Sequence, residues 1–148
     1  MAGTFGGYWQ GKILGHLVNN VTQTQQTLWV ALGTTTMWTA AGTGPAWECS
    51  NDGGYARYGV GTNSCFETVT FPGAGPYTGA IATNTATLTI SAGTTSNWGA
   101  VCMIAIMNTA TIGTGDVLAW CTAAATRTVN TGDQVLIAAG SLSIQVGP

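Results

Sequence analysis

The chain has 148 residues, of which only 5% are charged, and its formal net charge is −2. One domain is the default for this length, and such a domain can bury a core without disulfides or metal ions. Three basic residues cannot neutralise a row of phosphates or a surface of acidic lipid, so we expect the chain to bind no nucleic acid and no membrane. A chain with so little charge is more easily explained if partner proteins cover much of its surface. The alternative is a soluble monomer whose surface is rich in hydroxyl groups.

The N-terminal segment, residues 1–22, differs from the rest of the chain. Trp9, Ile13 and Leu17 recur in it at helical spacing. This pattern predicts a short amphipathic helix or arm, which either closes one end of its own domain or docks on a neighbouring copy. The single histidine, His16, lies here and is expected to be a helix-face or interface residue. The segment lacks the basic and apolar regions of a signal peptide, so we expect synthesis in a cytoplasm.

Residues 23–148 read as short strands joined by turns. Gly occurs 22 times and Thr is even more frequent, a composition typical of tight turns and half-buried strands. About eight short strands with no long helices between them indicate an all-β domain, an antiparallel β-sandwich of jelly-roll-like topology. The predicted strands are 27–33, 55–60, 65–71, 85–92, 98–107, 117–122, 134–138 and 142–146.

Two predicted strands and one loop have distinctive patterns. In 85–92, Leu88 and Ile90 alternate with threonines and are expected to face the core. The strand 98–107 is apolar on both faces, so we expect a central strand that is covered on both sides. The loop 34–54 is polar and rich in turn residues.

No set of titratable residues converges in the sequence. Asp116 and Asp133 each follow a glycine in a turn, where turn stabilisation explains them. Glu48 and Asp52 lie in one loop but lack the ladder of oxygen ligands that a calcium site needs. Arg57 is expected to form an ion pair or to anchor backbone. We therefore predict no catalytic activity, no metal site and no cofactor.

The four cysteines have no zinc-site spacing, and Cys102 and Cys121 are expected to be buried as small apolar groups.

The tryptophans divide into two groups. Trp29, Trp98 and Trp120 fall on apolar strands and are predicted to belong to the core. Trp38 and Trp47 fall in the long polar loop. A tryptophan there either pins the loop to its own domain or contacts a partner, such as a protein or a sugar.

The order of motifs resembles a family of small phage virion structural proteins described as tail-fibre-like. The motifs are YWQ at 8–10, KIL at 12–14, LWVAL at 28–32, GGYAR at 53–57, TFP at 70–72, WGAV at 98–101, RTVN at 127–130 and AGSLSI at 139–144. They span most of the chain. The sequence departs from the pattern at 105–108, where an aromatic residue and an aspartate would be expected, and in the loop 34–52.

The resemblance implies a virion component without catalytic residues. Jelly-roll proteins of this size also serve as capsid decoration, or cement, proteins, and a compact domain without a stalk favours that role. We therefore expect a homotrimer on the outer surface of the head that bridges subunits of the major capsid protein and is made in the host cytoplasm. The alternative is a tail-fibre or receptor-binding module that recognises a host surface glycan. The candidate partner contacts are Tyr8, Trp9, His16, Trp38 and Trp47.

Overall fold

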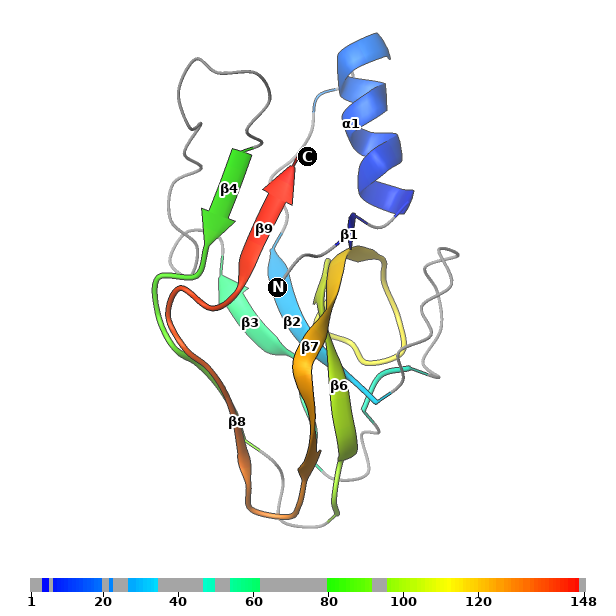
Figure 1. Cartoon of the computed structure of the whole chain (residues 1–148). Helices are drawn as coiled ribbons and strands as arrows, with labels where there is room; N and C mark the ends of the chain where they lie inside the picture. Colours follow the sequence, from blue (N-terminus) through cyan, green and yellow to red (C-terminus); the bar gives the residue numbers. More distant parts are fainter. Residues whose placement is uncertain are drawn as a thin grey trace.

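The computed structural model describes residues 4–5, 7–19, 22, 27–34, 47–49, 54–61, 80–91 and 96–146. The elements in chain order are β1 (Thr4–Phe5), α1 (Gly7–Asn19), β2 (Leu28–Gly33), β3 (Tyr58–Gly61), β4 (Ala80–Thr83), β5 (Leu88–Ser91), β6 (Gly99–Met107), β7 (Val117–Val129), β8 (Gln134–Ile137) and β9 (Ser143–Val146). All strand pairs among them are antiparallel. The prediction of an all-β domain with a short N-terminal helix is therefore confirmed (Figure 1).

The larger layer is a five-stranded sheet in the order β1-β7-β6-β2-β3. Its central strand, β6, pairs with β2 on one side and with β7 on the other. Every side chain from Val101 to Met107 is buried, so both faces of β6 are covered. The predicted central strand is confirmed, and its continuous apolar sequence follows from this burial.

The second layer is a two-stranded ribbon that bends once. The pairs β4·β9 and β5·β8 follow each other along the chain, so they form two parts of one ribbon (Figure 1). Asn84 lies at the bend and is buried. Its side chain accepts a hydrogen bond from the Leu142 amide (2.9 Å) and donates to the carbonyls of Ala86 (2.8 Å) and Ala138 (2.9 Å). Asn84 thus keeps the two halves of the ribbon together where the ladder is interrupted.

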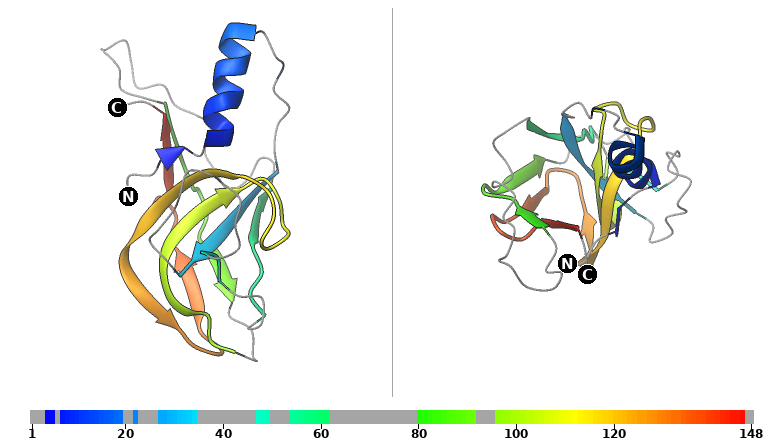
Figure 2. Two further views of the ribbon diagram at one scale, coloured as in Figure 1. Left: turned by 90° about the vertical axis from the view of Figure 1, so that its right-hand side faces the viewer. Right: turned by 90° about the horizontal axis from the view of Figure 1, so that it is seen from above.

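The main core lies between the sheet and the ribbon, which occupy opposite sides of a shared interior (Figure 2). Leu88 and Ile90 contribute to it from the ribbon, as their alternation with threonine predicts, and Leu32 and Ile104 contribute from the sheet. A smaller apolar cluster lies on the other face of the sheet; its buried members are Ala31, Trp47, Met103, Ala105, Met107 and Val117. Jelly-roll topology stays a prediction.

The largest differences from the predicted strand boundaries are at four strands, and one of them is β5, which begins at Leu88 rather than at residue 85. β3 begins at Tyr58 rather than at residue 55, and β4 was not predicted at all. β7 has 13 residues and continues to Val129, beyond the predicted end at 122. Its pairing with β6 is irregular between Thr122 and Arg127, where residues 123–126 form a bulge. The bulge interrupts the apolar pattern from which the full length of the strand could have been predicted. The predicted strand 65–71 lies outside the described residues.

Candidate interaction surface on the N-terminal helix

Helix α1 projects from one end of the β domain (Figures 1 and 2). The short strand β1 directly before it pairs with β7, with Thr4 opposite Trp120 and Phe5 opposite Ala119. Among the described elements, the helix contacts chiefly β7. The helix is therefore attached near its start, and much of its length stands away from the described domain.

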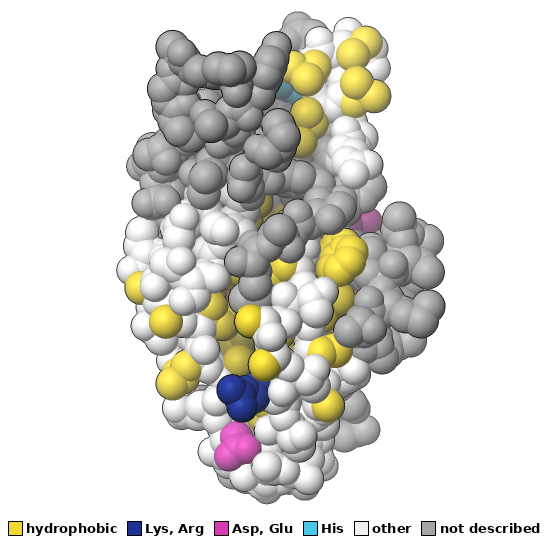
Figure 3. All heavy atoms as spheres, in the orientation of Figure 1, with side chains coloured by type: hydrophobic (Ala, Val, Ile, Leu, Met, Phe, Trp, Pro, Cys, Tyr) yellow, Lys and Arg dark blue, Asp and Glu magenta, His cyan; other side chains and the backbone are white. Residues whose placement is uncertain are grey.

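Three large apolar side chains on α1 are exposed. The exposed fractions are 62% for Leu14, 74% for Leu17 and 70% for Val18, and apolar atoms gather on the helix surface in Figure 3. Spacings of three and four residues place these side chains on one face, which we call the outer face. Ile13, by contrast, is half-buried. Full burial of one such side chain contributes about 1.5–3 kcal/mol. Since about a third of each is already covered, covering the rest of all three is worth about 3–6 kcal/mol per copy.

Two glycines border these side chains. A Cβ atom added to Gly11 or Gly15 would meet no heavy atom within 4 Å. Glycine inside a helix costs about 1 kcal/mol relative to alanine, because it loses more backbone entropy on folding. Nothing in the packing of the described protomer explains why these two positions lack a side chain.

The outer face carries no charge. Helix α1 has no acidic residue, and its permanent charge is that of Lys12. At 100° per residue, Lys12 lies about 120° around the helix from Val18. A surface that docks here meets apolar atoms and exposed backbone rather than an ion.

The structure places three of the five predicted partner contacts on α1. Tyr8 and Trp9 belong to the helix, although their side chains lie outside the described part. His16 lies in the last turn and is exposed. Trp38 lies outside the described residues. The apolar trio Leu14, Leu17 and Val18 was not proposed as a contact from the sequence, since helical spacing shows an apolar face but not which side is covered.

Trp47 is not an accessible contact, which corrects the prediction for this residue. Only 7% of its surface is exposed, because it packs beside Gly33 and Met103 on the sheet. Its carbonyl also accepts a hydrogen bond from the Thr34 amide at 2.8 Å. Trp47 therefore anchors its own loop, which is the other of the two roles considered for it.

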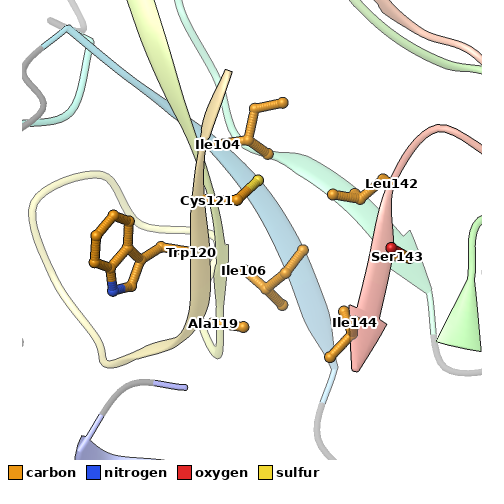
Figure 4. Close-up of a pocket in the computed structure, with 8 residues that line it drawn as sticks. All are labelled: Ile104, Ile106, Ala119, Trp120, Cys121, Leu142, Ser143 and Ile144. Atoms are coloured by element: carbon orange, nitrogen blue, oxygen red, sulfur yellow. The ribbon is translucent and has the colours of Figure 1, made fainter. Parts of the chain in front are cut away.

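Of the three tryptophans predicted to belong to the core, one is fully buried and two are only partly buried. Trp98 is buried in the main core and makes an edge-to-face contact with Tyr55, with ring centroids 5.2 Å apart. Trp29 and Trp120 are only half-buried and pack against the smaller cluster. Trp120 lies on the opposite side of β7 from Cys121 (Figure 4).

A buried ion pair lies between Glu48 and Arg57. The Arg57 Nε donates to Glu48 Oε1 and Nη2 donates to Oε2, both at 2.7 Å. Glu48 also accepts hydrogen bonds from the Tyr55 hydroxyl (3.1 Å) and the Gly113 amide (3.2 Å). Burial, and next the charge of Glu48, raise the pKa of Tyr55 far above its usual range. The carboxylate, the guanidinium, the hydroxyl and the amide thus all have hydrogen-bond partners within this network.

Arg57 also holds the loop between β6 and β7. Its Nη1 donates to the carbonyls of Thr109 (2.9 Å) and Thr114 (3.1 Å). The prediction that Arg57 pairs with an acid or anchors backbone is confirmed, in both respects. Glu48 is fully engaged by this network, so it is not available to a calcium ion. The predicted turn role of Asp133 is also confirmed, since its Oδ2 accepts from the Asn130 amide at 2.8 Å.

The described residues offer little to a small ligand. One cavity of about 20 Å³ lies between the β6·β7 face and β9 and is lined almost entirely by apolar side chains, including Ile104, Ile106 and Ile144 (Figure 4). Such a lining offers few polar groups to orient a small ligand. Within the described ranges no three metal-ligating side chains cluster, and no helix is long and apolar enough to cross a membrane. Cys49, Cys102 and Cys121 are buried free thiols.

The family model described as Podophage GP4 fiber I protein gp80 matches residues 4–145. The chain therefore belongs to this family of phage fibre proteins and is a structural component of a phage virion. No curated protein matches it.

Proposed function

We propose that the chain is a building part of a phage fibre, in which the β domain is the rigid body and α1 attaches it to a neighbouring subunit. The observation that carries this proposal is the outer face of α1, where Leu14, Leu17 and Val18 are each more than 60% exposed. A helix with such a face usually gains its stability by covering that face.

The family description favours a fibre over capsid decoration. It names a fibre protein, which corresponds to the alternative role derived from the sequence. The compact domain that favoured decoration is equally suitable for a fibre assembled from several parts. Both roles need a stable body and an adhesive element, so the position on the particle separates them.

Glycan recognition is not part of this proposal. The sequence assigned it to Trp38 and Trp47, and Trp47 is covered by its own domain. A homotrimer and a contact with the major capsid protein likewise stay predictions.

Location and copy number test the proposal. Purified particles would be labelled with gold-conjugated antibodies against the β domain and imaged, and the band of this protein would be compared with the major capsid band on a denaturing gel. We expect label at the tail and a faint band. Label over the head, with a band approaching that of the capsid protein, would instead establish decoration.

Removal of residues 1–20 tests the role of the helix. We expect the truncated chain to keep a folded β domain, because the main core contains no described residue of this segment. We also expect it to be absent from particles assembled in its presence. Loss of the β circular dichroism signal would show instead that the segment belongs to the core of its own domain.

A further inference from the structure

We propose that Arg127 and the bulge before it prevent the long free edge of β7 from pairing with a strand of another copy, so that the five-stranded sheet ends at this strand. This edge is distinct from the outer face of α1, so the two surfaces can be tested separately.

β7 has the longest free edge among the described strands. β6 pairs with it on one side along its length, whereas β1 covers the other side only at Ala119 and Trp120. Residues 122–128, which we call the free edge, have no partner strand there among the described elements, and all but Ala123 are exposed. The other edge strands in the described ranges have two or four residues. A long free edge is a template for strand addition, and a very short one is not.

Arg127 lies on the core side of this edge. Paired residues of neighbouring strands share a face of the sheet, and so do residues two apart in one strand. Arg127 is paired with Val101 and lies two residues before Val129. Both valines are buried in the main core, whereas Arg127 is exposed. Its guanidinium therefore lies at the border of the core, at a position where a wider sheet would have an apolar side chain.

A strand added to the free edge would extend the core over Arg127. The guanidinium would then lose much of its water, which is strongly unfavourable for a charge. Arg127 is also one of three basic residues in the chain, so a charge at this point is not the by-product of a highly charged surface.

The bulge is a second obstacle to strand addition. Between two successive ladder pairs β6 has the single residue Cys102, whereas β7 has residues 123–126. The extra residues bend the strand and increase its twist. A straight incoming strand therefore cannot follow the free edge on both sides of the bulge.

Two changes made together should open the edge. Deleting residues 123–125 leaves one residue opposite Cys102 and makes the ladder regular, and Arg127→Val replaces the charge with an apolar strand former. In sedimentation velocity of the full chain, we expect the combined variant to associate at a concentration about tenfold below that of the wild type. Loss of Arg127 moves the net charge further from zero than −2, which by itself favours separate copies.

Hydrogen exchange identifies the edge as the contact. The Val129 carbonyl accepts a hydrogen bond from the Trp98 amide (3.0 Å), so the alternation of a strand directs the Thr128 amide away from β6 to the free edge. This amide should exchange rapidly in the wild type and become protected when the combined variant associates. Adding Thr128→Pro removes this donor without the loss of a ladder bond, so it should return the combined variant to the wild-type state.

Two single variants are the matched controls. Arg127→Lys keeps the charge, and Thr128→Val adds an apolar side chain to the opposite face of the same strand, so neither should raise association. If the deletion prevents folding, Arg127→Val alone carries the test, with a smaller rise in association. Slow exchange of the Thr128 amide in the wild type would overturn the proposal. Association of the opened variant that is no stronger than that of the wild type, or that Thr128→Pro does not reverse, would also overturn it.

Discussion

The β domain and helix α1 differ in how far their apolar side chains are buried. In the domain, Leu32, Leu88 and Met103 are completely buried. On the helix, Leu14, Leu17 and Val18 expose most of their surface. The polar groups of the domain are also satisfied, since no buried side-chain nitrogen or oxygen of the described residues lacks a hydrogen-bond partner. The described part of the domain therefore satisfies its own buried groups, whereas the helix leaves an apolar face exposed, which we propose a neighbour covers.

The contrast also separates stability from assembly. Substitutions inside the domain should lower the free energy of unfolding, whereas substitutions on the outer face should change association and leave the domain folded. The following predictions test this separation, beginning with the largest expected effect.

Replacing Glu48 with alanine should cost about 3–5 kcal/mol of unfolding free energy, because it leaves the buried Arg57 without its counter-charge. Urea titration followed by tryptophan fluorescence would measure the loss. The double variant Glu48→Leu with Arg57→Met should recover much of it, since removing both charges also removes the cost of burying them.

The control for this experiment is Arg127→Ala. Arg127 lies on β7 with an exposed side chain, so its removal should change the free energy by less than about 0.5 kcal/mol. Equal losses for Glu48→Ala and Arg127→Ala would contradict the importance of the buried pair.

Asn84→Ala should cost about 3 kcal/mol, because three side-chain hydrogen bonds of about 1 kcal/mol each are lost at the bend of the ribbon. Hydrogen exchange should show faster exchange of the Leu142 amide, which donates to Asn84. Asn84→Asp keeps the acceptor for Leu142 but turns a buried carboxylate oxygen toward the carbonyls of Ala86 and Ala138, so its loss should be at least as large as that of Asn84→Ala. Retention of full stability in Asn84→Ala would show that water replaces the side chain.

Sequence patterns that extend over a few residues predicted the fold well. We recognised both the alternation at Leu88 and Ile90 and the continuous apolar run of β6. Both patterns consist of neighbouring residues, so they can be identified from the sequence alone. The length of β7 was not, because Ala123, Ala124 and Ala125 have weak strand preference and lie in the bulge.

The polar network required contacts that no local pattern contains. Arg57 was recognised as an ion-pair or anchoring residue, but its partner Glu48 comes from another segment, and Gly113 joins them from a loop 65 residues away from Glu48. Asn84 binds Leu142 across 58 residues. The exposure of the outer face of α1 could not be predicted from the sequence either. It depends on where the helix lies relative to the β domain, and the helical pattern does not contain this information.

The same substitution in the two regions should have opposite signs. Gly33→Ala places a Cβ atom 2.8 Å from Met103 Cε and 3.1 Å from the Trp47 carbonyl oxygen, so it should cost about 1–3 kcal/mol. Gly11→Ala meets open space and should stabilise the helix of the monomer by up to about 1 kcal/mol. Thermal unfolding at low protein concentration would compare the two. A destabilised Gly11→Ala monomer would contradict the open position assigned to this residue.

The last effect is absent near neutral pH and concerns the response of the domain to alkali. Burial, and next the charge of Glu48, raise the pKa of the Cys49 thiol from 9.0 to about 12. Below pH 9 the thiol is protonated in both the folded and the unfolded chain, so its contribution to stability is complete. Above pH 9 the unfolded chain releases this proton and the folded chain does not, so the unfolding free energy should fall by on the order of 1 kcal/mol per pH unit up to about 12.

Urea titrations at a series of pH values above 9 would measure this slope, with Cys49→Ala as the matched variant. Burial also raises the pKa of Cys121, and the raised pKa of Tyr55 acts in the same direction above pH 10, so Cys49→Ala should flatten the slope rather than abolish it. Identical slopes for the two proteins would mean that water reaches Cys49 in solution. Association through α1 should be insensitive to the same thiol, because Cys49 belongs to the main core and not to the outer face.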